Sequence, residues 1–221
     1  MREQETAFIG KITAGVTHEF MNVLATIRET SGLMEDLLAL SRETSFPHRE
    51  KFSRILTTIK KQVTRGMEIS GRLNRFAHSM DKPRARVEVN EIMDQLVFLM
   101  QRFTKLKHIT LNINPVEPPL VIFIDPFRLQ LILVECVEYC MDHIATGGVI
   151  TLQSRKTKQG IAIRSVIETG SRTTEKTDVL PDKLAGLQEI IQDLDARLLP
   201  ISTSGQQGME LILSLKTEQI S

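Results

Sequence analysis

The residues with the clearest capacity for chemistry lie close together near the N-terminus, in the stretch GVTHEFMNVL at positions 15 to 24. His18 is followed directly by the carboxylate of Glu19 and, four residues later, by the amide of Asn22. An exposed imidazole can attack an electrophile through one ring nitrogen while a hydrogen bond holds the other nitrogen. We therefore predict that His18 is a nucleophile, that Glu19 orients it or takes its proton, and that Asn22 places a water molecule or a phosphoryl oxygen.

The apolar spacing around His18 predicts the helix that presents it. At about 100° per residue, one set of apolar side chains falls within a stripe roughly 80° wide. The stripe consists of Ile9, Ile12, Val16, Phe20, Val23, Ile27, Met34 and Leu38. His18 lies about 170° from the centre of this stripe and is therefore predicted to face solvent. Its own face contains Ala14, Gly15 and Ala25, which are too small to shield the ring from another protein.

A second long helix is predicted from about residue 48 to residue 80. The stretch SRETSFPHRE contains Ser45 and Pro47, which can end one helix and start another. The apolar side of the second helix consists of Phe52, Ile55, Ile59, Val63, Leu73 and Ala77. Two such helices joined by a short link form a hairpin, but a lone hairpin cannot enclose two apolar stripes. We therefore expect two copies to pair as a homodimer with a four-helix bundle.

After a linker at Asp81 to Pro83, the pattern changes to alternating helices and strands, which predicts an α+β protein. The expected elements are a helix from Asn90 as cap to Phe103, strands at 108–113 and 119–124, a helix from the Asp125-Pro126 cap to about Ile144, strands at 149–154 and 160–167, a helix near 182–195, and strands near 198–203 and 208–215. This order predicts a mixed sheet covered on one face by helices. The chain then divides into a helical-hairpin domain, residues 1–82, and an α/β sandwich domain, residues 83–221.

The bulk composition narrows the possible partners and compartments. Lys and Arg number 28 against 27 Asp and Glu, so the charge balance gives no electrostatic case for nucleic acid or an anionic membrane. No segment approaches the roughly 20 uninterrupted apolar residues of a membrane span, and MREQETAFIG lacks the apolar region of a signal peptide. We expect a cytoplasmic protein. Cys136 and Cys140 lie four residues apart in an apolar helical pattern, which predicts buried structural thiols.

The stretch AGVTHEFMNVL resembles the phosphoacceptor box of dimeric sensor histidine kinases, approximately A-G-x-A-H-E-x-x-N-P-L. His18, Glu19, Asn22 and Leu24 are in register, and Val23 stands where the proline usually occurs. The remaining layout is also similar to that family, with a dimerisation hairpin followed by a Bergerat-type ATP-binding domain. The resemblance extends over essentially the whole chain and implies that His18 carries phosphate as a phosphoramidate.

The three nucleotide-binding boxes that the resemblance implies are degenerate. The N-x-x-x-N box, whose second Asn ligates magnesium, reads Glu135 and Tyr139, and tyrosine is a poor magnesium ligand. The D-x-G-x-G box, which recognises adenine, has Glu168 for the Asp and keeps only Gly170. The G-x-G-L box, which cradles phosphate with backbone amides at a helix N-terminus, has Leu184 in place of its first glycine.

The stretch between the second and third boxes is also shorter than the ATP lid of the family. Each lost polar contact to a charged ligand costs on the order of 1.5 to 3 kcal/mol. Three or four such losses exceed the binding energy of a micromolar nucleotide, about 8 kcal/mol. We therefore expect the domain to keep its fold and to bind no ATP or other cofactor itself, with any Mg²⁺ supplied by a partner receiver domain.

A dimeric bundle with an acceptor histidine beside a degenerate nucleotide domain resembles the histidine phosphotransferases of bacterial phosphorelays. The resemblance implies that His18 takes the phosphoryl group from the aspartate of a response-regulator receiver domain and passes it to a second receiver. One alternative is an active sensor histidine kinase core that autophosphorylates His18 from ATP. A second is a non-catalytic dimer that docks a response regulator. Dephosphorylation of a receiver through Glu19 and Asn22 can accompany transfer.

Overall fold

The computed structural model describes residues 2–40, 49–81, 83–168, 181–203 and 205–214. The chain forms two compact units. Residues 13–75 make the hairpin unit, and residues 1–12 together with 76–221 make the α/β unit. The predicted domain boundary at residue 82 stays a prediction. In the structure, the first residues of the chain pack with the C-terminal unit.

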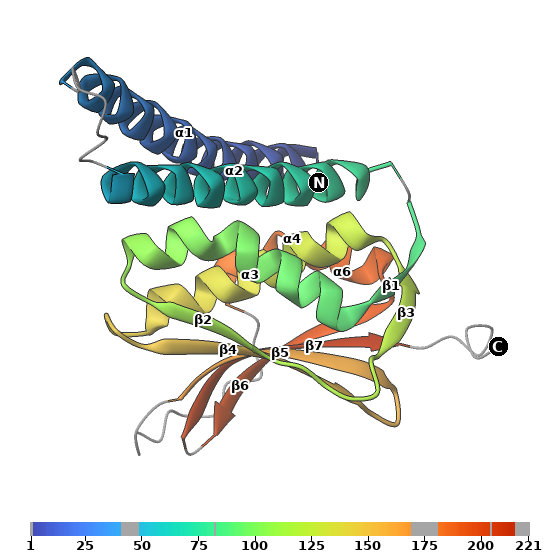
Figure 1. The fold of residues 1–221 in the computed structure, drawn as a ribbon. Coiled ribbons are helices and arrows are strands. Elements are labelled where there is room, and N and C mark those ends of the chain that lie inside the picture. The colour runs from blue at the N-terminus through green and yellow to red at the C-terminus, as the bar shows by residue number, and fades with distance from the viewer. Residues whose placement is uncertain (1, 41–48, 82, 169–180, 204, 215–221) are drawn as a thin grey trace. The chain divides into compact units, whose positions relative to one another are not determined.

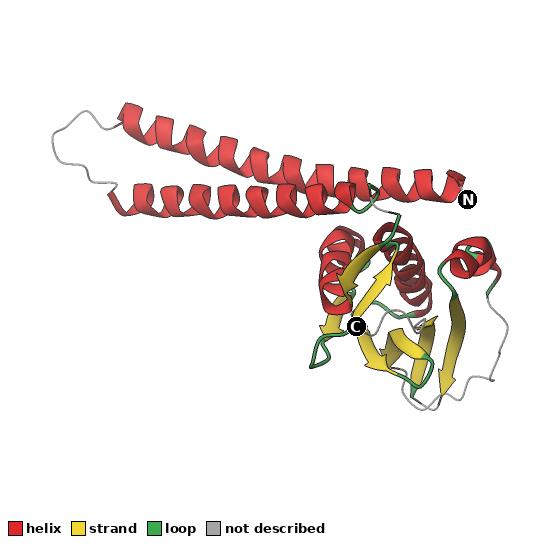
Figure 2. Ribbon diagram, turned by 90° about the vertical axis from the view of Figure 1, so that its right-hand side faces the viewer, coloured by secondary structure: helices red, strands yellow, loops and turns green. Residues whose placement is uncertain are grey.

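The hairpin unit consists of most of two long helices, α1 (Arg2–Leu40) and α2 (Arg49–His78). Neither helix contains a proline, and Glu50 lies in the first turn of α2, where a negative charge favours the helix N-terminus. The predicted long helical region is confirmed, and both helices stand out in Figure 2. The predicted break at Ser45 and Pro47 lies outside the described residues. No described helix is long and apolar enough to cross a bilayer.

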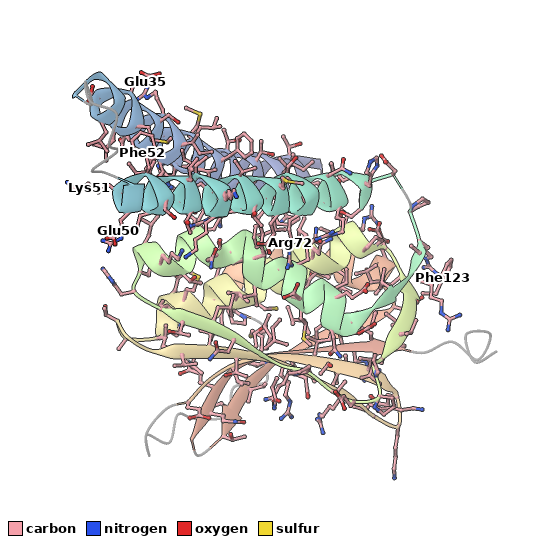
Figure 3. All side chains as sticks on the ribbon, viewed as in Figure 1. Glu35, Glu50, Lys51, Phe52, Arg72 and Phe123 are labelled. Atoms are coloured by element: carbon pink, nitrogen blue, oxygen red, sulfur yellow. The ribbon has the colours of Figure 1, made fainter. Side chains whose placement is uncertain are left out.

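The apolar stripes of the hairpin unit are only partly covered. Val16, Val23 and Ile55 are buried, as the stripes predict. Phe20, however, is 37% exposed and Val63 is 46% exposed. In a single hairpin only the side of each helix that faces the other helix is covered, so the outer part of a broad stripe stays in contact with solvent. Figure 3 shows the loop end of the two helices, where Glu35 of α1 and Phe52 of α2 are labelled.

The α/β unit is built on a five-stranded mixed sheet. Its strands are β2 (Thr110–Asn114), β4 (Val149–Lys156), β5 (Gly160–Glu168), β6 (Ala196–Thr203) and β7 (Gln206–Ser214). They lie in the order β2-β4-β5-β7-β6, and only the β2-β4 pair is parallel. The predicted mixed sheet is therefore confirmed. A second, two-stranded antiparallel sheet joins β1 (Ala85–Glu88) to β3 (Val121–Ile124), and β1 was not predicted.

Helices cover one face of the five-stranded sheet, as predicted. They are α3 (Val89–Leu106), α4 (Pro126–His143), α5 (Asp182–Ala185) and α6 (Gln188–Asp193). Figure 1 shows α3, α4 and α6 on the same side of the sheet. The central strand β5 is buried along almost its whole length, and only Arg164 and the last residue, Glu168, are partly or fully exposed.

Two helix starts test the predicted caps. The Asp125 carboxylate accepts a hydrogen bond from the backbone N–H of Arg128 at 3.0 Å and Pro126 follows it, so this cap is confirmed. The Asn90 cap is wrong, because α3 begins one residue earlier, at Val89. The Asn90 amide instead donates to the carbonyl oxygen of Val116 at 3.0 Å. The single helix expected near 182–195 is two short helices, α5 and α6.

The first three turns of α1 belong to the core of the α/β unit. The ring of Phe8 is 4% exposed and packs edge-on against Phe76, with ring centroids 5.4 Å apart. It also contacts Phe127 of α4 at a centroid separation of 5.4 Å. Lys11 forms an ion pair with Glu138, also on α4. These contacts fix the N-terminal part of α1 to α4 by apolar packing and by charge.

Candidate functional site

His18 is exposed on α1, on the side that its position opposite the apolar stripe predicts. Its Nδ1 atom is 3.2 Å from Nδ2 of Asn22, one turn further along the helix. A side-chain amide nitrogen can only donate, so Nδ1 accepts this hydrogen bond. The neutral ring then carries its proton on Nε2, and this nitrogen makes no hydrogen bond to any residue that the structure describes.

The residues around His18 have small side chains. Ala14 is exposed, Ala25 is half-buried and Gly15 is buried, so none of these residues rises over the imidazole. Met21 is 58% exposed and has a flexible, apolar side chain. A partner protein can therefore approach the ring closely, and Met21 and Ala25 offer it an apolar contact surface.

Glu19 has a different partner from the one that the sequence suggests. Its Oε2 atom lies 2.7 Å from Nη2 of Arg65 on α2. The Glu19 side chain is 21% exposed and that of Arg65 is 44% exposed. Within the described part of the chain, no hydrogen bond joins Glu19 to His18. The structure thus brings His18 together with Asn22, whereas Glu19 is held by an ion pair across the hairpin.

Gly66, the residue after Arg65, lies where α2 passes close to α1. A methyl group at Gly66 would lie 3.4 Å from Cγ1 of Val23 and 3.8 Å from Cε2 of Phe20. A methyl group would therefore just fit between the two helices at this point, whereas a larger side chain would not. The preceding residue, Arg65, reaches the carboxylate of Glu19. Arg65 was missed by the sequence analysis, since a pairing across a hairpin depends on the register of the two helices.

In the α/β unit, the residues at the predicted magnesium box lie on α4. Glu135 and Tyr139 are both half-buried. The Tyr139 ring packs on the ring of His143, with centroids 4.2 Å apart and planes inclined by 34°. Glu168, at the position of the adenine-binding acid, is the exposed last residue of β5. Gly170 lies outside the described residues.

The turn at the predicted phosphate cradle is part of the hydrophobic core. Leu184 is 0% exposed and Leu187 is 2% exposed. The backbone N–H of Leu184 donates to the carbonyl of Pro181 at 2.8 Å, and that of Leu187 donates to the carbonyl of Leu184 at 3.0 Å. In a phosphate cradle such amides point at the ligand. Here they are satisfied within the turn, and the side chain of Gln4 lies against Gly186.

Solved structures that resemble this arrangement are histidine kinases. A histidine kinase from Burkholderia phymatum STM815 matches with a TM-score of 0.51 and 11% identity, covering 90% of this chain and 97% of that chain. The Acinetobacter baumannii histidine kinase AdeS matches with a TM-score of 0.50 and 10% identity, covering 89% and 98%. The catalytic domain of histidine kinase ThkA matches with a TM-score of 0.50 and 11% identity, covering 60% and 97%.

This chain has a histidine kinase-like fold. The resemblance predicted from the sequence is therefore confirmed at the level of the fold. No family model matches the sequence, and no curated protein matches it either. At this low identity a structural likeness establishes the fold alone, and the chemistry of the chain depends on its own residues.

Both cysteines of the kinase-like unit are buried on α4, as predicted. Burial raises the pKa of the Cys140 thiol to about 12 and raises the pKa of Cys136 well above its usual range. The Cys140 thiol donates to the carbonyl oxygen of Ser165 at 3.3 Å. A buried thiol with a raised pKa is a poor nucleophile. The described residues also contain no group of three or more His, Cys, Asp or Glu side chains suited to a metal ion.

Proposed function

We propose that this protein is a histidine phosphotransferase of a two-component phosphorelay. It moves a phosphoryl group between the aspartates of response-regulator receiver domains through His18 and binds no ATP. The observation that carries this proposal is an exposed imidazole on a long helical hairpin, in a kinase-like chain whose phosphate turn is filled by Leu184 and Leu187. We place this activity in the cytoplasm.

The proposed reaction needs little from this chain beyond a positioned nucleophile. A ring nitrogen of His18 attacks the phosphorus of an aspartyl phosphate in line, and the P–O bond breaks with its electron pair going to the departing carboxylate. Transfer to the second receiver is the reverse step. Any Mg²⁺ belongs to the acidic pocket of the receiver. Alignment by the docked helices, with Met21 and Ala25 at the contact, is the contribution of this protein.

The turn between α5 and α6 supports the proposed absence of ATP chemistry. A triphosphate needs free backbone amides and close backbone approach at this turn. The amides of Leu184 and Leu187 are already bonded inside the turn, and both side chains are buried. To bind phosphate there, the unit would have to break these hydrogen bonds and expose core leucines. Tyr139 in place of a magnesium-ligating Asn adds to the same conclusion.

We also propose that the protein is a homodimer. Phe20 and Val63 belong to the apolar stripes of the two helices and stay largely exposed in the single hairpin. Pairing with a second hairpin into a four-helix bundle would remove this apolar surface from water. Light scattering on the purified protein should give twice the mass of one chain. A single-chain mass at micromolar concentration would contradict this part of the proposal.

The decisive experiment starts from receiver domains that carry a labelled aspartyl phosphate. We expect the label to move to the wild-type protein as an acid-labile phosphohistidine and not to move to His18→Ala. Incubation with labelled ATP and Mg²⁺ is expected to leave the protein unlabelled. If receivers from the same organism, tested as a complete set, leave wild-type His18 unlabelled, the phosphotransferase proposal fails.

A second candidate function is an active histidine kinase core, and the fold likeness to solved histidine kinases favours it. It predicts stable label on His18 from ATP alone. A third candidate, a dimer that only docks a response regulator, predicts that His18→Ala keeps partner function intact. Receiver dephosphorylation through Glu19 and Asn22 is compatible with transfer, and Asn22→Ala should slow phosphate release while sparing transfer.

A further inference from the structure

Glu19, the residue next to His18, forms an ion pair with Arg65 of the other helix. In the described structure the imidazole has one hydrogen-bond partner, the Asn22 amide nitrogen at Nδ1. The carboxylate nearest to it in the chain, Glu19, is held at 2.7 Å by Arg65 from the other helix. Neighbouring positions on a helix do not face each other, so Glu19 can reach the ring only by swinging along the helix surface. The contact with Arg65 competes with that movement.

The hydrogen bond from Asn22 favours the tautomer of His18 that cannot attack phosphorus through Nε2. With Nδ1 accepting from Asn22, the proton of the neutral ring sits on Nε2. Nε2 is the nitrogen without a partner among the described residues, so it is the one that a docked receiver can reach. A protonated nitrogen has no lone pair for phosphorus, and the lone pair of Nδ1 is engaged by the amide.

Attack through Nε2 requires the proton to move to Nδ1, where it needs an acceptor. A carboxylate is a better hydrogen-bond acceptor for Nδ1–H than a neutral group. Its hydrogen bond to the ring is charge-assisted and strengthens as the ring becomes cationic. Glu19 is the carboxylate next to the ring. The availability of Glu19 depends on Arg65, whose guanidinium is exposed enough to bind another anion.

We propose that Arg65 is a positioning residue that withholds Glu19 from His18 and thereby keeps the imidazole in its Nε2–H tautomer. The inference rests on the proposed function, because withholding Glu19 matters only if His18 accepts a phosphoryl group. The acidic pocket and phosphoryl group of a docked receiver compete for Arg65, Glu19 is released, and it accepts the hydrogen bond from Nδ1–H. The reactive tautomer then forms only when a phosphoryl donor is in place.

The transfer step balances with these groups. The Nε2 proton is first lost to water and a proton is gained at Nδ1, so the ring stays neutral. The Nε2 lone pair forms the N–P bond while the bond from phosphorus to the aspartyl oxygen breaks, and its electron pair leaves on the aspartate carboxylate. The product is a phosphorylated imidazolium that keeps its proton on Nδ1, hydrogen-bonded to Glu19. In the reverse transfer the same proton stays in place.

The test measures the tautomer of His18 directly by nitrogen NMR of the imidazole in the 221-residue chain. We expect the Nε2–H tautomer to dominate in the wild type and the Nδ1–H population to rise in Arg65→Gln. Arg65→Lys keeps the positive charge and should restore the wild-type tautomer. The double variant Arg65→Gln/Glu19→Gln should also return to Nε2–H, because the released acceptor is no longer a carboxylate.

A second readout uses phosphoramidate, a small phosphoryl donor that needs no partner protein. His18 nitrogen displaces ammonia from phosphorus, and phosphorus NMR follows the phosphohistidine. We expect Arg65→Gln to be phosphorylated faster than the wild type by up to about fivefold, the factor equivalent to a surface ion pair of about 1 kcal/mol. His18→Ala provides the background rate.

These outcomes separate the inference from the proposed function. An unchanged tautomer in Arg65→Gln overturns the role of Arg65, even if receivers transfer phosphate to His18 normally. A tautomer shift that Arg65→Lys reverses supports the role of Arg65, even if labelled receivers leave His18 unlabelled, in which case only the proposed function fails. A shift that persists in the double variant also contradicts the inference, because it shows that Glu19 is not the released acceptor.

Discussion

At the scale of single residues, Leu184 contributes to the hydrophobic core at a position where the resemblance implies a phosphate-binding glycine. The sequence alone indicated that a leucine had replaced a phosphate-cradle glycine, but not where its side chain would go. In the structure the side chain is 0% exposed, so it adds apolar burial at a turn where the amides of Leu184 and Leu187 are already hydrogen-bonded. Removal of this side chain is therefore expected to lower stability without restoring nucleotide binding.

We predict that Leu184→Gly destabilises the α/β unit by about 3 to 5 kcal/mol and does not confer ATP binding. The cost comes from the cavity and from the lost apolar contacts of a fully buried leucine. Urea unfolding followed by tyrosine fluorescence measures it, since the single tyrosine, Tyr139, lies on α4 of that unit. The neighbouring Ala185→Gly is the control, because Ala185 is exposed and its replacement should cost about 1 kcal/mol or less. Tight ATP binding by Leu184→Gly would show that the cradle is intact beneath the leucine.

At the scale of elements, α1 and α2 approach each other closely at Gly66, next to the ion pair of Arg65 with Glu19. We predict that Gly66→Ala stabilises the hairpin by up to about 1 kcal/mol, because the helix gains propensity and the methyl group makes only ordinary contacts with Val23 and Phe20. Gly66→Leu, in contrast, should cost about 1 to 3 kcal/mol by forcing the helices apart. Thermal unfolding followed by far-UV circular dichroism measures both changes.

Gly71 is the matched control on the same helix, since a methyl group there meets nothing within 4 Å. Gly71→Ala should give a gain similar to that of Gly66→Ala, whereas Gly71→Leu should be tolerated. If the two leucine variants cost the same, the contact at Gly66 does not set the spacing of the helices. The tautomer of His18 in Gly66→Leu provides a second check, because separation of the helices should release Glu19.

Three strands of the sheet are joined by a carboxylate on its helix-free face. Glu210 of β7 accepts hydrogen bonds from Arg155 of β4 at 2.9 Å and from Arg164 of β5 at 2.6 Å. Burial alone raises the pKa of Glu210, but the hydrogen bonds from the two arginines outweigh it, so the pKa is lowered in the folded protein. The folded state thus binds a proton at Glu210 less readily than the unfolded chain does.

The stabilisation from Glu210 is therefore fully present above the unfolded pKa and is lost as the pH falls through the lower, folded pKa. We predict that Glu210→Gln loses stability at neutral pH and that the difference from the wild type shrinks on acidification below the usual carboxyl range. Urea midpoints at neutral and acidic pH measure this. Arg164→Gln should show the same trend, since it removes one donor. A constant difference across the pH range would mean that the contribution is packing rather than charge.

The elements also show what the sequence could predict. The two long helices follow from a 3.6-residue period sustained over many turns, and the Asp125-Pro126 cap follows from local chemistry. The strand β1 was missed because four residues, two of them charged, are too short to show an alternation. The Asn90 cap failed because a contact with Val116, distant in sequence, took its amide. Contacts between distant segments decide such cases, and the pairing of Arg65 with Glu19 is another of them.

At the scale of the whole molecule, the boundaries of the two compact units fall inside α1 and α2 and not at the ends of these helices. The apolar stripe of α1 runs on from Ile9 without a break, so the sequence does not reveal that its first turns pack against a different partner from the rest. The packing shows this through Phe8, whose ring contacts those of Phe76 and Phe127. Residues 1–12 therefore count toward the stability of the α/β unit.

We predict that Phe8→Ala destabilises the α/β unit by about 3 to 5 kcal/mol, because it leaves a ring-sized cavity against two aromatic neighbours. Phe123→Ala is the matched control: it removes the same side chain from β3, where the ring is 47% exposed, and should cost less than about 1 kcal/mol. Urea unfolding followed by Tyr139 fluorescence reports the α/β unit, while circular dichroism reports the helices of both units. If Phe8→Ala leaves the Tyr139 transition unchanged and shifts only the circular dichroism, the first turns of α1 stabilise the hairpin instead. An unshifted Tyr139 transition in a variant that lacks residues 1–12 would have the same meaning, because that deletion also removes the Lys11 ion pair with Glu138.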